Sequence, residues 1–326
     1  MAQHARTREA QSRSMNVVLA SEDWLARRDR HRSRVSALLG PYAAQRAQGR
    51  SNPVTDFLFT YYNLTPRQLR WWHPGFGVTL TGPAAGEYED RRGYCRTDSG
   101  VCVDPDHLAR RGPTLEYVAE LMAATASRPA HLGCFGLHEW AMVYRADPEE
   151  LRHRVPLRLG REGTDAVVES MPLRCTHFDA FRFFTDPARQ RNAVQLSRPG
   201  QVATEQPGCL HAGMDLYRFA AKLLPLIDSD LLLDAFELAF AARELDMAAS
   251  PYDLRAFGYQ PVAIESAGGR AEYVRRQSAL AGRSAVVRLS LLRRSEQLLA
   301  IARGSSVNCP RKYIEDTASE IATGSV

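Results

Sequence analysis

The sequence of 326 residues has no run of about eighteen uninterrupted apolar residues, the length that a transmembrane helix needs. Residues 1–15, MAQHARTREAQSRSM, also lack the apolar run of a signal peptide. We therefore expect no association with a membrane and a cytoplasmic protein. The hydrophobic fraction of 44% is that of an ordinary globular chain, so the sequence is able to bury a sizeable core.

Cysteine and lysine are also scarce. The six cysteines are scattered without a Cys-x-x-Cys pair, so we expect reduced, mostly buried thiols and neither a zinc clip nor a redox dithiol. Lys222 and Lys312 are the two lysines among 42 basic residues. The net charge of +5 suggests an anionic partner such as nucleic acid, but the arginine bias of a GC-rich genome explains it more simply.

Motifs of several common enzyme classes are missing. The sequence has no Walker loop, no dinucleotide fingerprint after a strand and no Gly-x-Ser-x-Gly elbow. The paired Glu-x-x-His motifs of di-iron bundles and the His-Glu-x-x-His motif of metalloproteases are absent too. Nucleotide hydrolysis, dinucleotide-dependent redox chemistry and triad-based acyl transfer are therefore not predicted.

The apolar periodicity predicts a mostly α fold, a helical single domain with a small β insertion. Polar segments without period predict flexible tails at 1–15 and 304–326 around a domain of residues 16–303. Short β-compatible runs between glycines predict a hairpin region at 76–103, and two further strands are expected within 154–176. Helices are predicted at 21–39 (ending at Gly40-Pro41), from 52 onward, and at 66–72, 106–111, 114–126, 136–144, 210–227, 229–248 and 271–303.

Histidines gather in apolar sequence. Within CTHFDAFRFF, His177 and Asp179 lie among four phenylalanines, where an unpaired charge is costly. Two interpretations stay open: a His-Asp or Arg182-Asp179 pair that satisfies a buried polar spot, or a functional site. Four further histidines have similar surroundings, namely His73, His131, His138 and His211.

A helix that begins near residue 210 places four polar residues on one stripe, namely His211, Asp215, Arg218 and Lys222. The stripe is either a solvated face with ion pairs or part of a site, and the apolar entry QPGCLHAG favours a site. Isolated charges in apolar sequence are costly, so we expect His211 and Asp215 to face the same cavity as His177 and Asp179.

The following helix, residues 229–248, is apolar nearly all round, which is typical of a buried helix. Asp234 and Glu237 lie three residues apart on one of its faces. Buried carboxylates need cations, a metal or a raised pKa, and a raised pKa is how an enzyme prepares a general acid or base. The alternative is that arginines of neighbouring helices pair with both.

Five segments in order resemble a family of actinobacterial proteins that carry the name 3-methyladenine DNA glycosylase. They are PVTDFLFTYYNLTPRQLRWWHPGFG, RPAHLGCFGLHEWAMVYR, GTDAVVESMPLRCTHFDAFRFF, EQPGCLHAGMDLYRFAAKLLPL and ELDMAASPYDLRAFGYQPVAIES. The resemblance covers about residues 20–285 and implies a monofunctional glycosylase that binds DNA and removes alkylated purine bases without a cofactor. Such chemistry uses an aromatic pocket for the flipped cationic base, a carboxylate and a positioned water.

On this interpretation, the candidate catalytic residues are Asp179, Asp215, His177, His211, Asp234 and Glu237. The candidate substrate-binding residues are Tyr61, Tyr62, Trp71, Trp72, His73, His138, Glu139 and Trp140. The aromatic members of this set have a second interpretation as core residues. We expect one active centre that includes His138, Glu139, His177, Asp179, His211 and Asp215.

Two rival hypotheses use other features. The histidines and carboxylates offer the ligand types of iron, manganese or zinc, which favours a metal-dependent oxygenase or hydrolase that acts on a small molecule. A DNA-binding or scaffolding protein without enzymatic activity is the third hypothesis, and the arginine-rich segment 24–34 supports it.

Overall fold

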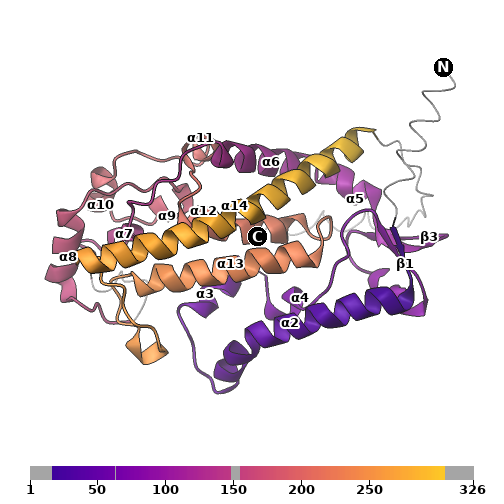
Figure 1. The fold of residues 1–326 in the computed structure, drawn as a ribbon, viewed down its shortest axis with the longest axis horizontal. Coiled ribbons are helices and arrows are strands. Elements are labelled where there is room, and N and C mark those ends of the chain that lie inside the picture. The colour runs from indigo at the N-terminus through magenta and orange to yellow at the C-terminus, as the bar shows by residue number, and fades with distance from the viewer. Residues whose placement is uncertain (1–16, 63, 148–154, 305–326) are drawn as a thin grey trace, which may run out of the picture.

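The computed structural model describes residues 17–62, 64–147 and 155–304, so the predicted tails lie outside the described residues except for Gly304. The described part is mostly helical with one small sheet, as predicted. The long helix α14 spans most of the molecule and packs against three other helices (Figure 1). These four helices are α6 (Gly112–Ala126), α12 (Leu210–Leu223), α13 (Ser229–Ala248) and α14 (Ala267–Gly304).

The sequence explains where the central helices begin and end. The side chain of Asp228 caps α13 by accepting a hydrogen bond from the Leu231 backbone N–H at 2.9 Å. α12 ends at Leu223, earlier than predicted, because Pro225 follows and proline cannot supply the next backbone donor. No helix of the described residues is both long enough and apolar enough to cross a membrane.

A four-stranded sheet lies at one end of the molecule (Figure 1) in the order β1-β2-β4-β3. Its strands are β1 (Val17–Leu19), β2 (Val78–Leu80), β3 (Tyr94–Thr97) and β4 (Gly100–Val103). The hairpin region predicted at 76–103 is confirmed, since β4 pairs antiparallel with both β2 and β3. β1 was not predicted, because its parallel partner β2 lies far along the chain, with Leu19 opposite Leu80.

The first long helix, α2 (Ser21–Ala47), passes the point where the sequence predicts its end. Pro41 lies inside α2, so the prediction of an end at Gly40-Pro41 is wrong. The residues after Pro41 include good helix formers, and the Tyr42 ring packs against Phe59 with centroids 4.9 Å apart. Tertiary packing therefore outweighs the hydrogen bond that the proline removes.

The two strands predicted within 154–176 are also wrong. The middle of this segment is α8 (Gly160–Ser170), which buries Thr164, Val167 and Val168. That spacing places the three side chains on one helical face, whereas the β-branched valines alone had favoured a strand. The remaining short helices are α3 (Thr55–Thr60), α4 (Pro66–Leu69), η1 (Pro83–Tyr88), α5 (Pro105–Arg110), α7 (Leu137–Ala141), α9 (Phe178–Phe181), α10 (Asp186–Arg191), α11 (Gln201–Thr204) and η3 (Arg255–Phe257).

Gly269, in the first turn of α14, touches the backbone of Ala263, and a Cβ at Gly269 would overlap the Ala263 carbonyl oxygen. We predict that Gly269→Ala lowers the free energy of unfolding by about 1–3 kcal/mol, because the backbone must shift. Gly282 in the same helix has open space around it, so Gly282→Ala should raise that free energy by about 0.5–1 kcal/mol. Urea titrations measure both, and equal stabilities of the two variants would contradict this packing.

Candidate functional site

Histidines and carboxylates from five elements meet in the interior. His138 and Glu139 belong to α7, and His211 and Asp215 belong to α12. His177 precedes α9, Glu205 follows α11, and Asp246 lies near the end of α13. These side chains form two adjacent groups of potential metal ligands, His177-Glu205-Asp215 and His138-Glu139-His211-Asp246.

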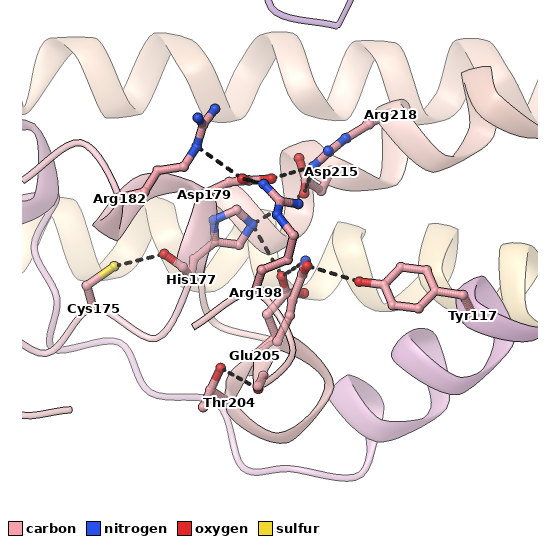
Figure 2. A network of polar contacts seen from close by, with 12 residues as sticks. Tyr117, Cys175, His177, Asp179, Arg182, Arg198, Thr204, Glu205, Asp215 and Arg218 are labelled. Carbon is pink, nitrogen blue, oxygen red and sulfur yellow. Dashed lines mark hydrogen bonds and ion pairs between the residues drawn. The ribbon is translucent and has the colours of Figure 1, made fainter. Parts of the chain in front are cut away.

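The first group centres on His177, whose side chain is 1% exposed. Its Nε2 atom lies 3.3 Å from Oε1 of Glu205 and 3.3 Å from Oδ2 of Asp215 (Figure 2). Both carboxylates are buried as well. Nδ1 of His177 has no hydrogen-bond partner among the described residues. Through Nε2, the imidazole faces two carboxylate oxygens at ion-pair distance.

The three side chains of this group shift one another's pKa values. Burial alone would lower the pKa of His177, but the charges of Glu205 and Asp215 outweigh burial and raise it. Burial raises the pKa of Glu205, and the neighbouring Asp215 adds to the effect. Two carboxylates so close together in a low-dielectric interior require a positive charge between them.

The second group is a buried ion-pair network. Nε2 of His138 lies 2.6 Å from Oδ1 of Asp246. Nη1 of Arg243 donates to Oε1 of Glu139 at 2.9 Å and to Oδ2 of Asp246 at 3.1 Å. The charge of Asp246 and its hydrogen bond raise the pKa of His138 against the opposing effect of burial. The Arg243 guanidinium already supplies the cation of this group, so it is the poorer of the two metal sites.

His211 lies between the two groups. Its ring centroid is 4.4 Å from that of His138 and 5.4 Å from that of His177. Burial, and then the charge of His138, hold the pKa of His211 well below its usual range. The ring is therefore neutral near pH 7.

His138 and His211 line a small cavity of about 20 Å³, which has room for a water molecule. Three cysteines, Cys134, Cys175 and Cys209, line the same cavity. Burial raises the pKa of each thiol, and that of Cys175 reaches about 12. The thiols are protonated at neutral pH, so the cavity offers no thiolate nucleophile.

Asp179 joins the site through arginines. Its carboxylate contacts Nε of Arg182 at 3.2 Å, Nη2 of Arg198 at 2.8 Å and Nη1 of Arg218 at 2.5 Å. The same Nη1 atom of Arg218 lies 3.2 Å from Oδ2 of Asp215. His177, Asp179 and Asp215 are thus neighbours (Figure 2), but none of these three residues lines the small cavity beside His211. The prediction that both pairs face one cavity is therefore not confirmed.

Asp234 and Glu237 lie elsewhere, so their predicted burial is wrong. Their side chains are 54% and 30% exposed, and both pair with Arg34 of α2 at 2.7 and 2.8 Å. The face of α13 that carries them turns toward α2 and solvent. In the same arginine-rich segment, Arg28 pairs with Glu87 at 2.9 Å. These ion pairs neutralise part of the charge on which the DNA-binding or scaffolding hypothesis depends.

The predicted substrate-binding aromatics do not form one pocket. Trp72 stacks on Trp24, and the fully buried Trp140 donates a hydrogen bond to the Ala249 carbonyl. Tyr62 is buried against Tyr217, and Trp71 packs against Tyr88. Tyr61 is half-buried, and burial, followed by the charges of Asp215 and Asp179, raises its pKa. The core interpretation therefore fits Trp72, Trp140 and Tyr62.

His73 is remote from the centre. Its backbone N–H donates to the Ser229 hydroxyl at the start of α13, whereas Asp246 lies near the end of that helix. Seventeen residues of helix separate Ser229 from Asp246, about 26 Å at 1.5 Å per residue. Burial and the nearby Arg91 lower the pKa of His73 to about 3. His73, which hydrogen-bonds Tyr94 at 2.8 Å, is a satisfied structural histidine.

Sequence reasoning missed three residues of the centre, Glu205, Arg243 and Asp246. A signal for two of them was present in the sequence. Arg243 and Asp246 are three residues apart within AARELDMAA, where the neighbouring alanines, leucine and methionine indicate burial. Glu205 stands in a short polar connection before Gln206-Pro207, so no periodicity identified it.

We predict that Asp246→Asn costs about 3–5 kcal/mol of stability, because it leaves the buried Arg243 and His138 undercompensated. Asp234→Asn is the matched control on the same helix. Its ion pair is half-exposed, so the cost should stay within about 1 kcal/mol. Chemical denaturation measures both, and a cost for Asp234→Asn as large as that for Asp246→Asn would reverse our assignment of buried and exposed charges.

The stability difference between wild type and Asp246→Asn should also depend on pH. His138 and Arg243 hold the pKa of Asp246 low in the fold against the opposing effect of burial, so its contribution is lost as pH falls below about 3.9. The raised pKa of His138 gives a contribution that is complete below about 6.5 and is lost as pH rises through the folded value. Denaturation at several pH values should therefore show the largest difference between about pH 4 and 6.5, and a constant difference would contradict the ion pair.

Comparisons with known proteins identified no relative of this chain. No protein-family model, no curated protein and no solved structure matches the chain.

Proposed function

We propose that this chain is a metal-dependent enzyme that acts on a small molecule, with the metal held by His177, Glu205 and Asp215. The observation that carries the proposal is the position of His177, whose Nε2 lies 3.3 Å from an oxygen of each of two buried carboxylates. The ligand atoms of these three side chains lie close enough together to share one ion. A neutral imidazole offers its lone pair to such an ion, and the carboxylates offer oxygen.

The distances support this proposal. Zinc binds histidine nitrogen and carboxylate oxygen at about 2.0–2.2 Å, which separates neighbouring ligand atoms of a tetrahedron by about 3.3–3.6 Å. Both separations from Nε2 are 3.3 Å. Two carboxylates also match the charge of a divalent ion, and this ion supplies the positive charge that their burial requires.

The donor set narrows the choice of metal and of chemistry. One imidazole and two carboxylates suit iron, manganese or zinc, and three protein ligands leave coordination positions for water or substrate. A metal bound here supplies a Lewis acid that lowers the pKa of a bound water. His211, whose ring centroid is 5.4 Å from that of His177, stays neutral beside the proposed ligands and adds no positive charge there.

We predict that the purified wild-type protein contains one equivalent of iron, manganese or zinc, and that His177→Ala and Glu205→Gln each lose most of it. His73→Asn, which changes a half-buried histidine remote from the centre, is the matched control and should keep the metal. Elemental analysis measures the content, and thermal melts show whether each variant folds. A folded His177→Ala with the full metal content would exclude this ligand set.

The glycosylase function stays a prediction from the family resemblance. Asp179 would have to stabilise the positive charge that develops on the sugar, but three arginines surround its carboxylate. The core positions of Trp72 and Trp140 also remove two members of the aromatic pocket. The metal-dependent function is therefore the one that the geometry supports better.

A base-release assay separates the two functions. A monofunctional glycosylase should release 3-methyladenine from alkylated duplex DNA in the presence of a chelator and leave abasic sites uncut. Lys222, the one lysine of the described residues, is the only side chain there that could form the imine of a lyase. We expect no release with or without metal, and release that survives the chelator would favour the glycosylase.

A further inference from the structure

We infer that the substrate of this centre carries an oxyanion, a carboxylate or a phosphate, and that Arg182 and Arg198 bind it. The inference rests on the proposed metal-dependent function and names the class of substrate. It comes from the arginines that surround Asp179 beside the three metal ligands.

The arginines form a ring that is buried on its inner side and open on its outer side. The carboxylate of Asp179 is 3% exposed, whereas the side chains of Arg182 and Arg198 are 40% and 55% exposed. Figure 2 shows both arginines reaching Asp179 from different segments, with Arg218 beyond it. Each outer arginine contacts Asp179 through one nitrogen, Nε of Arg182 and Nη2 of Arg198. A guanidinium has five N–H donors, so the two arginines keep donors for a second anion.

Aromatic rings hold these guanidinium groups in place. Cζ of Arg182 lies 4.0 Å from the ring centroid of Phe183, and Cζ of Arg198 lies 5.1 Å from that of Phe178. Stacking of this kind restricts a long side chain and leaves the edge of the guanidinium, where its N–H donors lie, accessible. The pair is therefore partly ordered before a ligand arrives, which reduces the entropy lost on binding.

The charge balance of the site favours an anion. Asp179, Asp215 and Glu205 supply three negative charges, and Arg182, Arg198 and Arg218 supply three positive charges. A divalent metal on His177, Glu205 and Asp215 leaves the whole assembly with two excess positive charges. An anionic ligand neutralises this excess in a region where water screens charge poorly.

A fourth arginine adds to the excess. Arg288 of α14 is 1% exposed, and its Nε and Nη2 atoms have no hydrogen-bond partner among the described residues. The carboxylate whose charge acts most strongly on Arg288 is that of Glu205. A buried guanidinium with unused donors is costly, so its presence near Glu205 is a second, independent sign that an anion completes this region.

The arginine ring lies next to the proposed metal ligands. Oδ2 of Asp215 lies 3.3 Å from Nε2 of His177 and 3.2 Å from Nη1 of Arg218. One carboxylate oxygen therefore connects the metal ligands to the ring. Arg182 and Arg198 contact Asp179, which Arg218 joins to Asp215, so an oxyanion that they bind would lie on the side of the site where Asp215 would hold the metal.

The size of the ring favours a small molecule over nucleic acid. Specific binding to DNA commonly uses about six to ten phosphate contacts over an extended basic surface. Only two guanidinium groups of this ring are substantially exposed, and both contact one oxygen, Oδ1 of Asp179. One oxyanion fits this arrangement.

The test is a titration of manganese-loaded full-length protein with inorganic phosphate and, separately, with acetate, followed by calorimetry. We expect saturable binding of at least one of the two anions, and at least a tenfold higher Kd for Arg182→Gln and for Arg198→Gln. Arg276→Gln, whose side chain is 44% exposed and pairs with Glu272, is the matched control and should bind like wild type. The two arginine variants should retain the metal, since neither residue is a metal ligand.

Preference for phosphate or for acetate identifies the source of the oxyanion. Unchanged affinity in both arginine variants, or no saturable binding to a protein that holds its metal, would overturn the oxyanion inference and leave the metal site intact. Loss of metal from wild type would contradict the proposed function instead. Competition by duplex DNA that is equally sensitive to Arg182→Gln and Arg198→Gln would overturn the small-molecule substrate in favour of nucleic acid.

Discussion

The burial of Arg243 is the constraint on which the centre of the molecule depends. A guanidinium that is 1% exposed must be paired, because an isolated buried charge costs several kcal/mol. Its partners, Glu139 of α7 and Asp246 of α13, are therefore fixed in position. Asp246 in turn orients the ring of His138. These charge-assisted hydrogen bonds link the short helix α7 to the long helix α13.

From this network, a continuous series of contacts leads outward to solvent. His138 packs against His211, and His211 lies beside His177. His177 faces Asp215, which Arg218 connects to Asp179. The inner charges are paired with one another, although Nε of Arg243 has no hydrogen-bond partner among the described residues. The His177 group, in which Nδ1 of His177 also lacks a partner, lies between this network and the exposed arginines.

The ligand side chains of the proposed metal site are held in place by neighbouring residues. A metal ligand must hold its geometry without collapsing onto its neighbours, and a shell of fixed hydrogen bonds around it achieves this. Here Gln201 donates to Glu205, and Tyr117 donates to Gln201 at 3.0 Å. Arg218 holds Asp215 in the same way. Each carboxylate of the proposed metal site therefore has its own supporting partner.

The sequence by itself determined the helical class, the hairpin region and the identity of α13, because these follow from local periodicity and from Gly and Pro positions. It also predicted that His177, Asp179, His211 and Asp215 lie close together. The reason is that an unpaired charge in apolar surroundings is costly, so paired charges are more stable there. It located the β-branched residues of α8 in a strand and Asp234 in the interior, since propensity and an all-round apolar helix do not say which face meets a neighbour.

Only the tertiary structure decided which charges are buried. Asp246 and Asp234 lie on one helix, yet Asp246 meets Arg243 and His138 in the core, whereas Asp234 meets Arg34 near solvent. Glu205 joins the centre through a connection without periodicity. Such pairings join residues far apart in the chain, and their energies depend on burial and on distances of a few ångströms. Local sequence records neither quantity, so packing alone sets them.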